Sequence, residues 1–118
     1  MTFLCYERCS TCKKAKAFLE AAGVAFDVRD IKGEHPNQEE LERLWKKSGL
    51  PLKRFFNTSG QLYRELNIKD RLPEMTEAEQ LELLASDGML VKRPMLIEED
   101  FVLVGFKEAE WKEKLGLQ

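Results

Sequence analysis

The sequence predicts an α/β fold in which a mixed four-stranded sheet carries an all-helical insertion at about residues 36–88. Three observations predict it. The first thirty residues alternate between strand and helix patterns, the next fifty carry only helix signals, and strand patterns then return. With 118 residues, 43% of them hydrophobic, the chain is long enough for one core and too short for two, so we expect a single domain over residues 1–118.

The opening of the chain has a strand, a helix and a second strand. Residues 2–6 are short and apolar and precede a charged, cysteine-bearing loop, which is typical of a buried strand entering a turn. A helix follows and ends at Gly23. Residues 24–28 then alternate between apolar and polar side chains, which indicates a strand. The apolar positions of the helix are Cys12, Ala15, Phe18, Leu19 and Ala22.

The insertion is expected to hold three helices. The first begins after Asn37 and ends at Gly49, and the third begins with a capping box of Thr76 and Glu79. A short helix between them follows the turn-like residues 57–60. The apolar faces are, in chain order, Leu41, Leu44 and Trp45; Leu62, Tyr63 and Leu66; and Ala78, Leu81, Leu84 and Ala85.

The chain closes with a hairpin and a helix. Residues 95–97 and 101–104 are apolar and flank an acidic turn, which predicts a β-hairpin. A last helix carries Trp111 and Leu115 one turn apart. We expect four aromatic residues in the core and a pair of cations on a solvated face. These are Trp45, Phe55, Phe56 and Trp111, and Lys53 with Arg54.

Composition excludes several classes of protein. Nineteen Lys and Arg against 21 Asp and Glu give a net charge of −2, which offers no electrostatic basis for direct nucleic-acid binding. No apolar stretch approaches the roughly 20 residues that span a bilayer, and no signal peptide is evident, so we expect a cytoplasmic protein without membrane association. The three cysteines all lie in the first twelve residues, which indicates a reducing compartment.

The motif Cys9-Ser10-Thr11-Cys12 lies where a strand gives way to a helix. Unpaired N–H groups and the helix dipole stabilise a thiolate at such a position, and Lys13 adds positive charge nearby. Cys9 is the more exposed thiol and is therefore the predicted nucleophile. Cys12, one turn inside the helix, is placed to attack a mixed disulfide at Cys9 and release the product.

Other interpretations of the cysteines are open. Cys9 and Cys12 are also compatible with simple packing, and a zinc site would need both of them together with Cys5 and the lone His35. Because His35 lies beside a proline in a polar loop, we expect no metal. Cys5 is expected in the core, with a regulatory thiol as the alternative.

Arg93-Pro94 precedes the hairpin. A cis bond there would turn the preceding backbone toward a bound thiol or peptide, and a trans proline at a strand start is equally compatible with the sequence. The planar guanidinium of Arg93 suits a carboxylate or an oxyanion, or is a surface charge.

Five motifs spread over essentially the whole chain resemble one known family, that of the glutaredoxin-coupled arsenate reductases and the Spx regulators. They are Cys9-Ser10-Thr11-Cys12-Lys13-Lys14-Ala15; Phe56-Asn57-Thr58-Ser59-Gly60 with Tyr63-Arg64-Glu65-Leu66; Leu84-Ala85-Ser86-Asp87-Gly88-Met89-Leu90; Arg93-Pro94; and Val104-Gly105-Phe106. The resemblance implies a thioredoxin-like fold of the glutaredoxin type with a helical insertion, and a proline that faces the reactive cysteine.

The resemblance also implies site residues. In the arsenate reductases a cysteine attacks arsenate and three arginines stabilise the anion; Cys9 and Arg93 match the cysteine and one arginine. Asn57 and Phe106 stand at the other two arginine positions, so we expect little true arsenate reduction. No cofactor is expected to be bound, and glutathione, glutaredoxin or another thiol is the implied reductant. The residues expected to contact substrate are Ser10, Thr11, Lys13, Asn57 and Pro94.

The sequence thus favours a thiol–disulfide oxidoreductase that acts on a small thiol-bound or oxyanion substrate or on a redox partner protein. The alternative is an Spx-like redox-sensing regulator. The resemblance implies that such a regulator binds the C-terminal domain of the RNA polymerase α subunit near Ser48-Gly49-Leu50.

Overall fold

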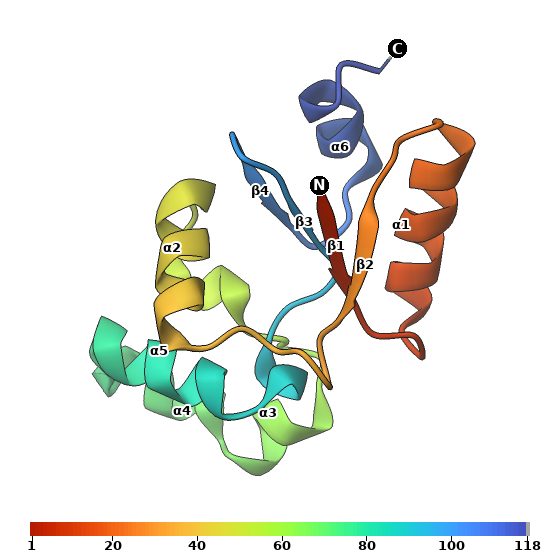
Figure 1. The fold of residues 1–118 in the computed structure, drawn as a ribbon. Helices are drawn as coiled ribbons and strands as arrows, with labels where there is room; N and C mark the ends of the chain where they lie inside the picture. Colours follow the sequence, from red (N-terminus) through yellow and green to blue (C-terminus); the bar gives the residue numbers. More distant parts are fainter. Residues whose placement is uncertain (118) are drawn as a thin grey trace.

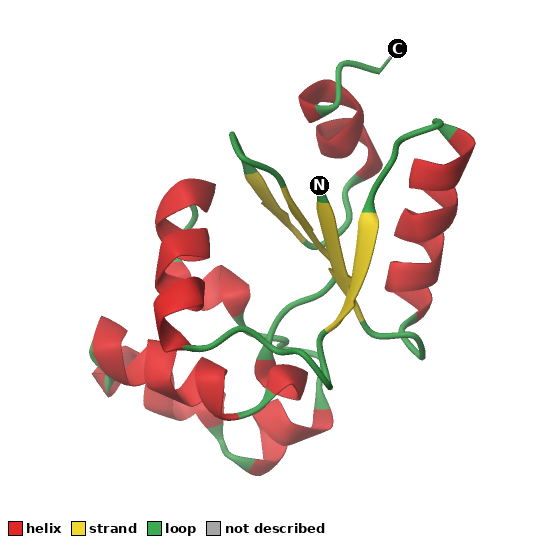
Figure 2. Cartoon of the chain, viewed as in Figure 1, coloured by secondary structure: helices red, strands yellow, loops and turns green. Residues whose placement is uncertain are grey.

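The computed structural model describes residues 1–117 and contains a four-stranded sheet in the order β2-β1-β3-β4 (Figures 1 and 2). Strand β1 (Thr2–Cys5) runs parallel to β2 (Asp27–Asp30) and antiparallel to β3 (Met95–Ile97). Strand β4 (Val102–Val104) completes the predicted hairpin with β3. The mixed sheet with this strand order confirms the thioredoxin-like α/β fold.

Only helical elements lie between β2 and β3 among the described residues, which confirms the all-helical insertion. Four of the short helices given below, η1, α4, η2 and η3, were not expected from the sequence pattern. The helices in chain order are α1 (Ser10–Ala21), α2 (Gln38–Ser48), η1 (Leu52–Phe55), α3 (Gln61–Glu65), α4 (Ile68–Arg71), η2 (Leu72–Glu74), α5 (Glu77–Ser86), η3 (Gly88–Leu90) and α6 (Glu108–Lys114), where η marks a 3₁₀ helix.

The two faces of the sheet carry separate apolar clusters. Successive side chains of a strand point to opposite faces, so Phe3 and Cys5 pack with α1 and α6, whereas Leu4 packs with the insertion. Figure 1 shows α1 and α6 on one side of the sheet and α2 with α5 on the other. Trp111 of α6 is fully buried and its Nε1 donates a hydrogen bond to the Gly105 carbonyl at 3.0 Å. The two layers hold β1 in the centre of the molecule.

The predicted caps of the insertion are present. The side chain of Asn37 accepts a hydrogen bond from the Glu40 N–H at 2.9 Å, and Gly49 ends α2 in the left-handed region with φ 70°. Thr76 and Glu79 exchange both hydrogen bonds of the capping box, at 2.9 and 3.1 Å. The starts of α2 and α5 (Glu77–Ser86) therefore lie where local sequence chemistry places them.

The second strand lies further along the chain than predicted. The Val24 N–H donates to the Leu19 carbonyl at 3.1 Å while Gly23 adopts φ 71°, so residue 24 still belongs to the end of α1. Strand pairing begins at Asp27, whose N–H donates to the Met1 carbonyl at 2.9 Å. The alternating pattern at 24–28 is thus shared between a helix end and an edge strand, whose Val28 is 54% exposed.

Most of the predicted core is confirmed. Phe55, Phe56 and Trp111 are buried, and Trp45 is half-buried with its Nε1 donating to the Leu50 carbonyl at 2.9 Å. Ala78 and Leu66, expected on apolar faces, are exposed, so that part of the prediction is wrong; the buried residues of α5 are Leu81 and Leu84. Within residues 1–117 no helix is both long and apolar enough to traverse a bilayer.

Candidate functional site

Cys9 is the N-cap residue of α1. Its backbone is extended, at φ −89° and ψ 119°, and its carbonyl accepts the first helical hydrogen bond, from the Lys13 N–H at 3.1 Å. Its Sγ accepts a hydrogen bond from the Cys12 N–H at 3.4 Å, the bond that a serine or aspartate usually makes at this position. The chain folds this way because the Cys9 N–H donates to the Tyr6 carbonyl at 3.0 Å and closes a turn after β1.

Cys12 lies behind Cys9 in the first turn of α1. Its side chain is buried in the cluster under α1, and its Sγ accepts a hydrogen bond from the Tyr6 N–H at 3.4 Å. Cys5 is buried in the same cluster, as expected for a core position. All three cysteines are free thiols, and Cys9 is the least buried of them.

The environments of Cys9 and Cys12 move their pKa values in opposite directions. Burial acts to raise the pKa of the Cys9 thiol, but hydrogen bonds from the Cys12 N–H, the Cys12 thiol and the Thr11 N–H, with the charge of Arg93, hold it below its ordinary value. Burial raises the pKa of Cys12 to about 12, against the opposing hydrogen bond from the Tyr6 N–H. At neutral pH Cys9 is therefore the acidic thiol and Cys12 stays protonated.

Cys9 opens into a cleft of about 630 Å³. The cleft lies between the start of α1, the insertion and the loop that follows β4. Besides Cys9, its lining consists of Tyr6, Arg8, Ser10, Thr11, Arg54, Asn57, Ser59, Gly60, Lys92, Arg93, Val104, Gly105, Phe106 and Lys107. Among the described residues no aspartate or glutamate lines the cleft, and none of its cations forms an ion pair. The lining of the cleft therefore carries net positive charge next to Cys9.

Arg93 is held in place by three contacts. Its Nη1 donates to the carbonyls of Met89 and Val91 at 3.2 and 3.3 Å, and its guanidinium carbon lies 5.3 Å from the centroid of the Tyr6 ring. The peptide bond between Arg93 and Pro94 is cis. The two carbonyls fix one side of the guanidinium while its charge acts on Cys9.

The structure brings most of the predicted site residues together. Ser10, Thr11, Asn57 and Arg93 line the cleft with Cys9, and Cys12 is buried directly behind it. Pro94 is buried and does not line the cleft. Lys13 is exposed on α1 and is also absent from the lining, so the structure gives it no contact with the site. Phe106 does line the cleft, as the resemblance implied.

Sequence reasoning missed four cations of the cleft. Arg8, Lys92 and Lys107 were not singled out, and Arg54 was assigned with Lys53 to a solvated face. Arg54 is indeed exposed, but it also lines the cleft. These residues come from four separate segments, so no spacing pattern links them. The one available signal was their position next to recognised motifs.

A metal site finds no support within residues 1–117, because no group of three or more His, Cys, Asp and Glu side chains is arranged to hold an ion. His35 is exposed, and a nitrogen of its ring lies 3.1 Å from the Ala85 carbonyl oxygen.

Comparison with known proteins agrees with the geometry. Uncharacterized protein YusI of Bacillus subtilis is 54% identical to this chain over 113 residues, covering 96% of both. Regulatory protein MgsR of the same organism is 31% identical over 110 residues, covering 93% of this chain and 86% of MgsR. The relatives thus include a protein named as a regulator.

Solved structures show the same fold. An ArsC family related protein from Bacteroides fragilis is 51% identical, with a TM-score of 0.93, over 95% of this chain and 94% of that one. A possible arsenate reductase from Streptococcus mutans is 44% identical, with a TM-score of 0.87, over 98% and 97%. The model of the ArsC family matches residues 4–114. Because the family model matches nearly the whole length of this chain and the relative YusI is 54% identical to it, the chain belongs to the ArsC family.

Proposed function

We propose that the protein is a thiol–disulfide oxidoreductase with Cys9 as nucleophile and Cys12 as resolving thiol. The observation that carries the proposal is the opposite displacement of the two pKa values inside one helical turn, at the wall of a cationic cleft. An attacking thiol must be a thiolate, whereas a resolving thiol must stay protonated until it is needed. The lowered pKa of Cys9 and the raised pKa of Cys12 support these two roles.

The first step forms a mixed disulfide. The Cys9 thiolate attacks one sulfur of the substrate disulfide, forms a new S–S bond and releases the other substrate sulfur as a thiolate, which takes a proton from solvent. The N–H groups of Thr11 and Cys12 that stabilise the Cys9 anion lose that role once its sulfur is bonded. The cations of the cleft favour a substrate that carries negative charge.

The second step resolves the mixed disulfide. Cys12 gives up its proton and attacks Cys9 Sγ, so that a Cys9–Cys12 disulfide forms and the remaining substrate sulfur leaves and takes up a proton. The substrate disulfide has gained two electrons and the protein has lost two. A thiol reductant, glutathione, glutaredoxin or another thiol, returns the two electrons and restores both cysteines.

Steady-state reduction of a small anionic mixed disulfide tests this proposal. The wild type should turn over with a thiol reductant, Cys9→Ser should be inactive, and Cys12→Ser should accumulate the mixed disulfide at Cys9. Serine is itself a favoured N-cap residue, so Cys9→Ser keeps the start of α1 intact. Equal turnover by wild type and Cys9→Ser would refute the proposal.

A second candidate function is a redox-sensing regulator that binds RNA polymerase. The similarity to Regulatory protein MgsR favours it. The implied contact region lies at the end of α2, where the Leu50 N–H donates to Ser48 Oγ at 3.1 Å and Gly49 is exposed. Direct binding to the C-terminal domain of the polymerase α subunit, measured with reduced and with oxidised protein, separates the candidates. Redox-dependent binding without disulfide turnover would select the regulator.

A further inference from the structure

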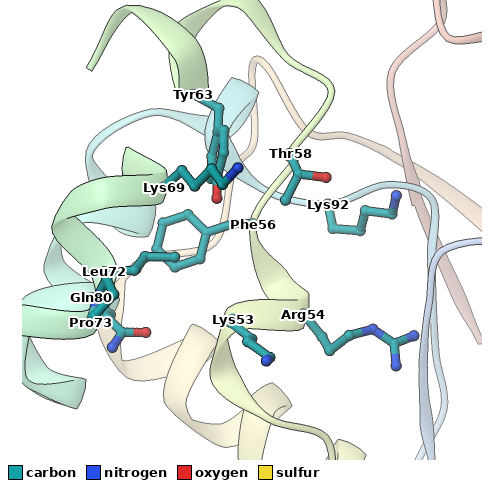
Figure 3. A pocket seen from close by; sticks show the side chains of 10 residues that line it. All are labelled: Lys53, Arg54, Phe56, Thr58, Tyr63, Lys69, Leu72, Pro73, Gln80 and Lys92. Atoms are coloured by element: carbon teal, nitrogen blue, oxygen red, sulfur yellow. The ribbon is translucent and has the colours of Figure 1, made fainter. Parts of the chain in front are cut away.

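The insertion contains a second cavity, of about 520 Å³, beyond the cleft at Cys9. Figure 3 shows Phe56 at its centre, with Tyr63 and Leu72 beside it. The ring centroids of Phe56 and Tyr63 lie 6.4 Å apart with the ring planes tilted by 59°. Phe56 is buried, so the apolar surface open to solvent belongs to the half-buried Tyr63 and Leu72. The complete lining is Lys53, Arg54, Phe56, Thr58, Tyr63, Lys69, Leu72, Pro73, Gln80 and Lys92.

Cations surround this apolar floor. Lys53 and Arg54 come from η1, Lys69 from α4 and Lys92 from the loop before β3. As in the cleft at Cys9, none of them forms an ion pair with a described residue, and the lining contains no carboxylate. In a chain of net charge −2, such a grouping is complementary to an occupant that is both apolar and acidic.

The second cavity and the cleft at Cys9 are neighbours. Arg54 and Lys92 line both, and in Figure 3 their charged ends point away from Phe56. The wall between the cavities is fixed by backbone pairing, because the Lys92 N–H donates to the Phe55 carbonyl at 2.8 Å and the Asn57 N–H donates to the Leu90 carbonyl at 2.7 Å. These hydrogen bonds join the two segments that carry Arg54 and Lys92, and an occupant that reaches both cavities must be elongated.

We propose that the disulfide substrate of Cys9 is a polypeptide, and that the insertion cavity binds an aromatic or large aliphatic side chain of it that is flanked by acidic residues. This rests on the proposed oxidoreductase function. The apolar side chain lies on Tyr63 and Leu72, the flanking carboxylates meet Lys53 and Lys69, and the disulfide reaches Cys9 past Arg54 and Lys92. The peptide disulfide is the group that is reduced, and it gains the two electrons that the cysteine pair loses.

Binding is tested first without chemistry, on the full-length Cys9→Ser protein. The probes are fluorescent synthetic peptides with one cysteine blocked as a disulfide with neutral 2-mercaptoethanol and a phenylalanine between two glutamates, at a set of spacings from the cysteine. Anisotropy should show binding that weakens with added salt. Adding Lys53→Gln and Lys69→Gln should weaken it by about fivefold, since each exposed charge contributes modestly.

Matched controls isolate the cavity. Lys112→Gln removes one positive charge from α6, at a residue that lines neither cavity, and should leave the affinity unchanged. Replacing the peptide phenylalanine with alanine should weaken binding by about tenfold, and replacing its glutamates with lysines should abolish it. N-acetylphenylalanine, a compact anion with the same ring, should compete only poorly with the peptide.

The outcomes separate this inference from the proposed function. Equal affinity for acidic and basic peptides, an effect of Lys112→Gln as large as that of the double substitution, or strong competition by N-acetylphenylalanine would overturn the polypeptide assignment. If the polypeptide assignment holds, turnover by the wild type should show a lower KM for the acidic peptide disulfide than for the peptide whose phenylalanine is replaced with alanine. Selective binding without Cys9-dependent turnover would instead refute the oxidoreductase and leave a peptide-binding cavity.

Discussion

The Sγ atom of Cys9 accepts a hydrogen bond from the Cys12 N–H at 3.4 Å, so the proposed nucleophile also caps the helix that carries its partner. A thiolate accepts such a bond better than a thiol does, because the acceptor is then charged. The same contact therefore holds the geometry of the pair and lowers the pKa of Cys9. It links the fold of α1 to the chemistry of the cleft.

Alkylation should distinguish the two cysteines of the motif. Because the pKa of Cys9 is lowered, its reaction with iodoacetamide should rise through a midpoint below the ordinary value for cysteine. Cys12, whose pKa is raised to about 12, should stay unmodified throughout the neutral range. Mass spectrometry of quenched samples over a pH series gives both curves, and a Cys9 midpoint at or above that of a free thiol would contradict the prediction.

Removing the Arg93 charge should raise the pKa of Cys9, because that charge helps to stabilise the thiolate. Arg93→Gln should thus shift the alkylation curve to higher pH and slow the reaction at neutral pH. Lys107→Gln is the matched control, since Lys107 lines the same cleft and is not among the groups that lower this pKa. Equal shifts in both variants would indicate a general field rather than a specific contact.

Mild oxidation should join Cys9 to Cys12 and spare Cys5. The motif pair lies in one helical turn, whereas Cys5 is 8% exposed and burial raises the pKa of its thiol. Diamide treatment followed by peptide mapping checks this, with Cys5→Ala as the control that should form the same disulfide. A bond between Cys5 and either partner would assign the resolving role differently.

Arsenate should be a poor substrate. The cleft contains Asn57 and Phe106 where the family resemblance implies arginines, and each missing charged donor costs about 2.7–4 kcal/mol if it acts like an oxyanion-hole donor. Arg8, Arg54 and Lys107 are exposed, so water and salt screen them. Glutaredoxin-coupled turnover of arsenate should thus fall several orders of magnitude below turnover of a mixed disulfide.

The comparison is made with the wild type and with Cys9→Ser, at low and at high ionic strength. Efficient, salt-sensitive reduction of arsenate by the wild type would show that the exposed cations replace the missing arginines.

Gly88→Ala should destabilise the fold strongly. A Cβ at this buried position would overlap the Ile31 carbonyl oxygen and lie 2.8 Å from the Cβ of His35. Because backbone atoms cannot move aside cheaply, we expect a loss of about 3 kcal/mol in the free energy of unfolding, measured by urea titration. Gly33→Ala, whose Cβ would lie 3.2 Å from the flexible carboxylate of Asp30, should change it little.

Features that depend on residues close together in the sequence could be predicted. Features that depend on contacts between distant residues could not. The caps at Asn37 and Thr76 depend on residues three positions away, so the sequence shows them directly. Strand β2 was displaced because its alternating pattern overlaps the end of α1, and α4 was missed because only Ile68 of its four residues is buried. Tertiary contacts, not local preference, decide both.

The candidate site also contains residues that the sequence could predict and residues that only the fold reveals. Cys9, Cys12 and Arg93 belong to motifs that can be read in the sequence, whereas Arg54 and Lys107 reach the cleft only because the insertion and the loop after β4 meet the start of α1 there. The charged residues of the sequence, taken alone, give no reason to prefer these over any other exposed cation.

The hydrogen bond by which Cys9 caps α1 links the pKa of Cys9 to the stability of that helix. The free energy with which this contact favours the Cys9 thiolate lowers the pKa of Cys9. The same free energy stabilises the start of α1 when the sulfur is ionised. This stability is full above the pKa of an unfolded cysteine and is lost as the pH falls through the lowered value. Once Cys9 is bonded to a substrate sulfur, its anion can no longer anchor the first turn. The redox state of Cys9 therefore changes the stability of the first turn of α1.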